Sequence, residues 1–267
     1  MVEQLDRLVT ERFGFKESFP VTGQTYPRKA DAQIVSSLAG IAASVHKFAN
    51  DIRLLAGMKQ IEEPFEAEQV GSSAMAYKRN PMRCERATGL ARFVISLAGS
   101  PLQTAAEQWF ERTLDDSSNK RLSIPEAFLA IDGCLQIVID VARGLVVYPK
   151  TIEAAVRAEL PFMATEEILM AGVQAGGDRQ ELHERIRTHS QAAAQQVKME
   201  GMPNDLLQRL QEDDVFVSLR VQWNELMDAS RFIGRAPEQT DQFIGCVIEP
   251  IRLRYTGRLQ QTVELKV

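Results

Sequence analysis

The chain has 267 residues, of which 45% are hydrophobic and 25% are charged, an ordinary composition for a soluble globular protein. Its formal net charge of −5 argues against nucleic acid as a partner, and no apolar run of about 18 residues predicts a membrane span. The three cysteines are widely spaced and fit neither a disulfide framework nor metal-ligand spacing, so we expect a cytosolic protein.

The strongest helical pattern lies between Lys29 and Gly57. Apolar residues recur there at alternating spacings of four and three, which is typical of a long helix that packs lengthwise against other helices. Residues 61–81 show no helical periodicity, and we expect a long loop there. The apolar seam of the predicted helix consists of Ile34, Leu38, Ile41, Val45, Phe48, Ile52 and Leu55.

Three more helical segments are predicted before residue 147. One covers 82–98, and the Ser100-Pro101 pair ends it before a second segment at 102–110. The third begins at Ser123, which we interpret as an N-cap that forms a capping box with Glu126. Its heptad seam consists of Ile124, Phe128, Ile131, Leu135, Val138, Ala142 and Leu145.

The pattern changes near residue 147 to shorter amphipathic segments. The sequence therefore predicts an all-α fold with part of a long-helix bundle at 1–147, containing the loop 61–81, and a smaller helical domain at 148–267. An incomplete bundle leaves apolar seams uncovered, so we expect an oligomer. The shorter segments lie near 149–159, 163–175, 178–199, 204–212 and 238–254, and 263–267 alternates like a strand.

A basic stretch follows the middle of the loop. Between Tyr77 and Arg92 the chain carries five basic residues and only one acid, Glu85, which indicates an anion site in an otherwise acidic protein. Pro81 and Met82 open the next helix, whose N-terminal N–H groups would add to the site. The alternative is a solvated basic face. The basic residues are Lys78, Arg79, Arg83, Arg86 and Arg92.

Several motifs are similar to one enzyme family. Residues 71–80, Gly-Ser-Ser-Ala-Met-Ala-Tyr-Lys-Arg-Asn, resemble the signature loop of the fumarase/aspartase superfamily, and their extension to Arg86 is similar to the adenylosuccinate lyase branch of the kind found in animals. Further similar segments lie at 22–26, 51–55, 108–117 and 159–166. We therefore expect the resemblance to cover nearly the whole chain.

The resemblance implies a β-elimination that releases fumarate. The substrates implied are adenylosuccinate, which gives AMP, and the succinyl-carboxamide ribotide SAICAR, which gives AICAR. The family's general base falls on Ser72, and Lys78 and Asn80 would hold the substrate carboxylate that takes up the carbanion's charge. Neither metal nor cofactor is implied, and the expected assembly is a homotetramer with active sites shared between subunits.

The same resemblance assigns further substrate-binding positions. By itself, an arginine such as Arg112 or Arg121 would be interpreted as a surface salt-bridge residue, although paired guanidinium groups do suit phosphate. The family pattern places Gln24, Ser73 and Arg86 against the substrate, and Arg112, Ser117 and Arg121 at the nucleotide, chiefly its phosphate.

Histidine is the usual acid or base near neutral pH, but none of the three matches the family's general acid. We interpret His46 as a packing or interface residue, and His183 and His189 as solvated. Trp109 and Phe110 are expected to be core residues next to the site.

Two departures from the family pattern bear on activity. Ala76 stands where the family has proline, which predicts a more mobile loop. The resemblance also begins midway through the family's fold, so we expect little or no lyase activity from this chain alone. The alternative function is a non-catalytic helical module that joins or inhibits full-length tetramers. A related lyase acting on argininosuccinate, aspartate or malate is disfavoured by the block around Trp109 and by the arginines placed for phosphate.

Overall fold

The computed structural model describes residues 1–65, 75 and 77–258, and the prediction of an all-α fold is confirmed. The chain forms two compact units, one covering Met1–Val147 and the other beginning at Tyr148. The strand-like segment 263–267 lies outside the described residues.

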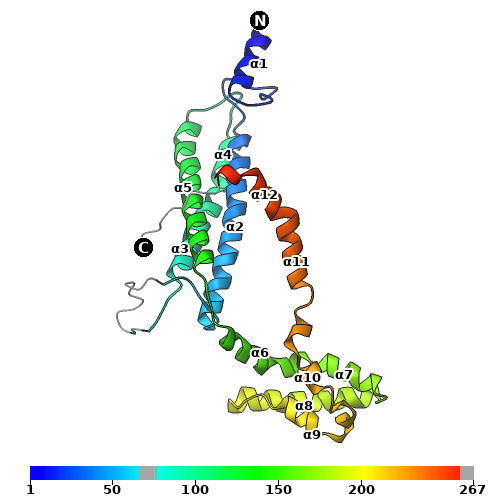
Figure 1. Cartoon of the computed structure of the whole chain (residues 1–267). Helices are drawn as coiled ribbons and strands as arrows, with labels where there is room; N and C mark the ends of the chain where they lie inside the picture. The colour runs from blue at the N-terminus through cyan, green and yellow to red at the C-terminus, as the bar shows by residue number, and fades with distance from the viewer. Residues whose placement is uncertain (66–74, 76, 259–267) are drawn as a thin grey trace. The chain divides into compact units, whose positions relative to one another are not determined.

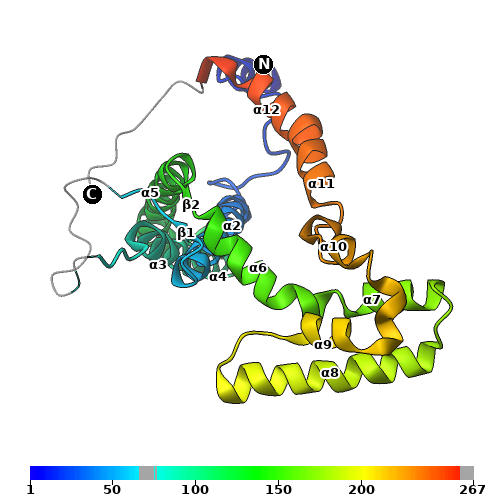
Figure 2. The same cartoon turned by 60° about the horizontal axis from the view of Figure 1, so that its bottom comes forward.

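The first unit is built on long, roughly parallel helices (Figure 1). A short helix α1 (Val2–Arg12) precedes α2 (Lys29–Gly57), which packs along α3 (Met82–Leu97) and α5 (Asp115–Arg143), with α4 (Gly99–Ala106) between the last two in sequence. Figure 2 looks nearly along the bundle and shows α2, α3 and α5 grouped together. A two-residue strand β1 (Ile61–Glu62) pairs antiparallel with β2 (Val146–Val147) and brings the start of the predicted loop beside the end of α5.

Small residues let these helices approach closely. Ala42, Ala49, Ala91 and Ala127 have no exposed surface, because each lies where one helix backbone meets another. The predicted bounds of α2 are confirmed. The bundle core consists of Val35, Leu38, Ala42, Val45, Ala49, Ile52, Cys84, Ala87, Ala91, Val94, Ala127, Ile131, Cys134, Ile137 and Val141.

The two predicted seams are only partly buried. On α2, Leu38, Val45 and Ile52 lie in the core, but Ile34 and Ile41 are 44% and 41% exposed. The reason is that, among the described residues, each of the long helices α2, α3 and α5 packs lengthwise only against the other two, so its buried face is narrower than its apolar face. A similar apolar surface on α5 remains exposed, and it includes Phe128, Leu129, Leu135 and Ile139.

The predicted start of the third helix was wrong. Helix α5 begins at Asp115, so Ser123 lies inside it and donates a hydrogen bond from Oγ to the carbonyl of Asn119 at 3.2 Å. Pro125 is also internal, and it removes only one backbone donor from a long helix. By length and mean hydropathy (1.6 over its most apolar window) α5 could cross a membrane. It packs against α2 and α3, and 28% of that window is buried.

The second unit contains shorter helices around a separate core. Helices α6 (Pro149–Met163), α7 (Thr165–Gln174), α8 (Arg179–Glu200) and α9 (Leu206–Glu212) match the predicted segments within a few residues, and α10 is Trp223–Leu226. Asp178 caps α8 by accepting hydrogen bonds from the N–H groups of Gln180 and Glu181. The predicted helix at 238–254 consists of α11 (Ala236–Phe243), a π-helical segment (Ile244–Ile248) and α12 (Glu249–Arg254). Short 3-10 helices cover 214–219, 229–232 and 256–258.

Candidate functional site

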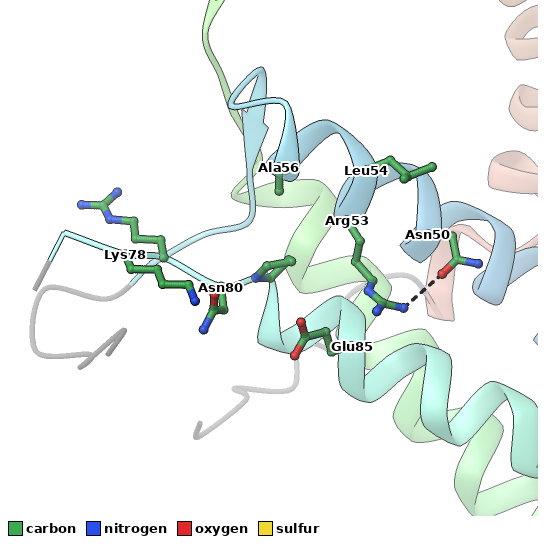
Figure 3. Close-up of a pocket in the computed structure, with 10 residues that line it drawn as sticks. Asn50, Arg53, Leu54, Ala56, Lys78, Asn80 and Glu85 are labelled. Carbon is green, nitrogen blue, oxygen red and sulfur yellow. Dashed lines mark hydrogen bonds between the residues drawn. The ribbon is translucent and has the colours of Figure 1, made fainter. Parts of the chain in front are cut away.

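A pocket of about 610 Å³ lies where the end of α2 faces the segment that leads into α3 (Figure 3). Lys78 and Asn80, both predicted site residues, line it. The predicted base Ser72 and its neighbour Ser73 lie outside the described residues, as do Gly71 and Ala76. The remaining lining residues are Asn50, Arg53, Leu54, Ala56, Gly57, Arg79, Pro81 and Glu85.

The start of α3 is occupied by an internal carboxylate. Glu63, which is 5% exposed, accepts hydrogen bonds from the N–H groups of Arg83 (2.8 Å) and Cys84 (3.1 Å). Pro81 provides no side-chain cap, so Glu63 caps the helix from across the base of the loop. The expectation that these N–H groups are available to a substrate anion was therefore wrong.

The basic stretch also divides into two kinds of residue. Arg83 is 4% exposed, with Nε 3.2 Å from Oδ2 of Asp140, and it donates from Nη1 to the carbonyl of Pro64. Arg79 pairs with Glu62, with 3.3 Å between Nη1 and Oε2. These two arginines hold the base of the loop together. Lys78, Arg86 and Arg92 are exposed and keep the character of an anion-attracting surface.

The predicted phosphate group surrounds the start of α5. Arg112 lies 3.6 Å from Asp116, and Ser117 and Arg121 follow one helical turn apart on α5. Arg112 and Ser117 are half-buried and Arg121 is exposed, so all three offer polar groups to a ligand.

A buried ion pair attaches the segment of Gln24 to the same end of α5. Nε of Arg28 lies 2.6 Å from Oδ2 of Asp116. The guanidinium carbon of Arg28 lies over the ring of Tyr26, 4.5 Å from the ring centre. A Cβ at Gly23 would lie 3.1 Å from Cγ of Glu111, so the segment before α2 passes directly beside the one that carries Arg112. Gln24 itself is exposed.

The predicted site residues in the pocket, such as Lys78, and those near the start of α5, such as Gln24 and Arg112, lie at opposite ends of one bundle. Gln24 precedes the first residue of α2, whereas the pocket with Lys78 is lined by its last residues, and α2 has 29 residues. At a rise of ~1.5 Å per residue the helix is about 43 Å long. Figure 1 shows the starts of α3 and α5 at the two ends of α2. A single copy of the chain therefore cannot bring both groups to one small ligand.

The structure adds residues that the sequence interpretation missed. Asn50 and Arg53 line the pocket, and the helical spacing of three, together with their place at the end of α2, could have indicated them. Asn50 contacts the Nδ1 atom of half-buried His46 at 3.1 Å, in keeping with a packing role for that histidine.

His189 was wrongly taken as solvated, since its Nε2 lies 2.8 Å from the buried carboxylate of Asp213. Trp109 and Phe110 are exposed, not core residues.

Comparisons with family models cover two parts of the chain. Residues 2–96 match a model described as "Lyase", and residues 161–243 match one described as "Adenylosuccinate lyase C-terminus".

Curated relatives are similar over most of the chain. Adenylosuccinate lyases of Schizosaccharomyces pombe and Saccharomyces cerevisiae are each 54% identical over 91% of it, and that of Schistosoma mansoni is 47% identical over 93%. The chain spans about half the length of these relatives, namely 50%, 50% and 52%.

Solved structures share the fold at lower identity. A 3-carboxy-cis,cis-muconate lactonizing enzyme from Pseudomonas putida superposes with a TM-score of 0.70 at 21% identity, covering 85% of this chain and 49% of that one. A fumarate lyase from Mesorhizobium sp. BNC1 gives 0.66 at 22% identity, covering 82% and 47%.

Proposed function

Because this chain belongs to the adenylosuccinate lyase family, we propose that it provides the fumarate-binding and phosphate-binding parts of an adenylosuccinate lyase active site. The reaction is β-elimination of fumarate from adenylosuccinate, giving AMP, and from SAICAR, giving AICAR. The observation that carries the proposal is the cationic pocket in which Lys78 and Asn80 lie together directly after the signature loop. No metal or cofactor enters this chemistry.

In this proposal Ser72 removes the proton from the carbon next to a carboxylate. A serine hydroxyl is a weak base, so its deprotonated form must be stabilised by positive potential in a site from which water is excluded. Lys78 supplies such a charge, whereas the amide groups at the start of α3 do not, because Glu63 occupies them. Asn80 and Lys78 then stabilise the charge that develops on the substrate carboxylate. Ser73 and Arg86 contact the substrate nearby.

The residues around the start of α5 are assigned to the nucleotide end of the substrate. Arg112 and Arg121 offer planar, forked donor sets that suit phosphate oxygens, and Ser117 adds a hydroxyl beside them. Gln24 contacts the substrate from the adjoining segment. These assignments follow the family pattern and the shared location of the residues at the start of α5.

The distance between the two groups supports a site shared between copies. We propose a homo-oligomer, and by resemblance a homotetramer, in which the pocket of one copy meets the α5 start of another. The exposed apolar side chains on α2 and α5 support this, since burying them between copies would remove that apolar surface from water. The proposed compartment is the cytosol.

Fumarate release tests the proposal. The chain is assayed alone and after mixing with the S. pombe adenylosuccinate lyase in which the serine corresponding to Ser72 is replaced by alanine. We expect little turnover from either protein alone and restored turnover in the mixture, with mixed oligomers seen by light scattering. Mixed oligomers that release no fumarate would instead favour the non-catalytic assembly module. Turnover by the chain alone near that of the S. pombe enzyme would contradict the expectation of an incomplete site.

A further inference from the structure

We propose that Arg53 is a second carboxylate-binding side chain of the pocket and that, with Lys78, it selects a dicarboxylate over a monocarboxylate. This inference rests on the proposed function, because it assigns the second carboxylate of the fumarate group to a particular residue. The observations that carry it are the anchoring of the Arg53 side chain, the charge balance of the pocket and the positions of its two cationic walls.

Neutral groups hold the Arg53 guanidinium in place. Nη1 donates to Oδ1 of Asn50 at 3.2 Å on the same helix and to Oγ1 of Thr88 at 3.3 Å on α3. Thr88 is 3% exposed, and its hydroxyl donates back to the carbonyls of Cys84 and Glu85 at 2.9 and 2.8 Å. Its oxygen lone pairs are therefore available to Arg53, and the side chain is fixed across the gap between α2 and α3 without losing its charge.

Within the described part of the chain, Arg53 has no ion-pair partner. Among the described residues, no carboxylate oxygen lies within 4.0 Å of its guanidinium, and both of its hydrogen bonds are donated by Nη1. Arg79 differs, because it pairs with Glu62. With Arg79 paired, the remaining cations of the pocket are Arg53 and Lys78, and the lining holds a single acid, Glu85. A bound anion would therefore balance the remaining positive charge.

The two cations approach the pocket from different walls. Figure 3 shows Arg53 on α2 and Lys78 on the segment that enters α3, with Asn80 beside Lys78. A volume of about 610 Å³ accommodates a four-carbon diacid with room for the group attached to it. An unused edge of a planar guanidinium binds a carboxylate through two parallel hydrogen bonds, a geometry that lysine does not provide.

Binding of fumarate and crotonate to the whole chain tests the inference by calorimetry. Crotonate has the same trans geometry, but a methyl group replaces one carboxylate. We expect wild type to prefer fumarate, Arg53→Gln to weaken fumarate binding about tenfold or more with crotonate unchanged, and Arg53→Lys to fall between. The control is Lys47→Gln, which removes the same charge from α2 at a side chain that is 77% exposed and should change neither affinity.

Equal fumarate affinity in wild type and Arg53→Gln would overturn the inference, as would a wild-type chain that does not prefer fumarate to crotonate. Circular dichroism verifies the helical content of each variant, and Arg53→Lys provides a second reading if Arg53→Gln is unfolded. The outcome is separate from that of the mixing assay. A lost preference in Arg53→Gln, combined with mixed oligomers that release no fumarate, would sustain a dicarboxylate site and refute the lyase function.

Discussion

Arg28 and Asp116 form a buried ion pair, in which Nε and Oδ2 lie 2.6 Å apart and the two residues are 2% and 4% exposed. The pair joins the segment before α2 to the first turn of α5, residues that are 88 positions apart in sequence. It therefore sets the place of Gln24 relative to Arg112 at one end of the bundle. Desolvated charges of this kind hold a particular arrangement more than they add net stability.

Replacing Asp116 by Asn should strongly destabilise the first unit. The change leaves the Arg28 guanidinium buried without its counter-charge, and breaking a buried pair in this way costs about 3–5 kcal/mol. Urea unfolding followed by circular dichroism measures the loss. Asp115→Asn is the matched control, because Asp115 is exposed one residue earlier and should change the unfolding free energy by less than ~1 kcal/mol. Equal effects of the two variants would contradict the role of the pair.

Glu63→Gln should loosen the start of α3 while the rest of the bundle stays folded. Losing a charged cap lowers local stability by about 1–2 kcal/mol, so the amides of Arg83 and Cys84 should exchange hydrogen faster. Hydrogen exchange followed by NMR measures the exchange rate of each backbone amide. Glu62→Gln removes the neighbouring charge, whose partner is Arg79, and should leave both amides protected. Unchanged exchange in Glu63→Gln would rule out the capping role.

Stability should fall at alkaline pH because of Cys84. Burial, and then the nearby Glu63 charge, raise the pKa of the Cys84 thiol from its ordinary value of 9.0 to about 12. Below pH 9 the thiol is protonated in both states, so its contribution to stability is complete. Above that, only the unfolded chain loses the proton, and the unfolding free energy should fall by at most about 1.4 kcal/mol per pH unit until about pH 12.

Urea concentrations at the unfolding midpoint, measured between pH 8 and 10.5, test this decrease in the unfolding free energy. Cys84→Ala should show a shallower decline than wild type, although burial also raises the pKa of Cys134 and leaves part of the slope. Identical slopes in the two proteins would refute the assignment to Cys84.

Lys78→Gln should lower fumarate release by the mixed assembly by about 100-fold or more, because the charge developing on the substrate carboxylate would lose its cation. Arg92→Gln is the control. It removes an equal charge from the same basic stretch at an exposed position on α3 outside the pocket, and we expect it to retain activity. Full activity in Lys78→Gln would mean that another group stabilises that charge.

Arg112→Gln should weaken binding of AMP about tenfold while leaving adenosine unchanged, since the two ligands differ only in the phosphate. Calorimetry on the mixed assembly compares them. A general structural disturbance would weaken both ligands alike, and that result would remove Arg112 from the phosphate site.

The sequence predicted those features that depend on local order. The bounds of α2 follow from its apolar period, and α8 lies within one residue of the segment predicted near 178–199. Predictions from neighbouring residues were wrong where a residue distant in sequence contacts the start of a helix. Ser123 and Glu126 have the spacing of a capping box, but α5 continues through them to a start at Asp115, whose next residue pairs with Arg28. Similarly, the start of α3 has the appearance of an anion site in sequence, yet Glu63 fills it.

By itself the sequence determined the helical class, the division into long and short helices, and the family through its signature residues. Each of these depends on residues that are close together in the sequence. The tertiary structure alone decided which side chains meet. It placed Arg53 opposite Lys78 and separated both from Gln24 by the length of α2. Spacing along a chain fixes the face of a helix on which a residue lies, but only the packing of helices fixes which end of the bundle that residue occupies and what faces it there.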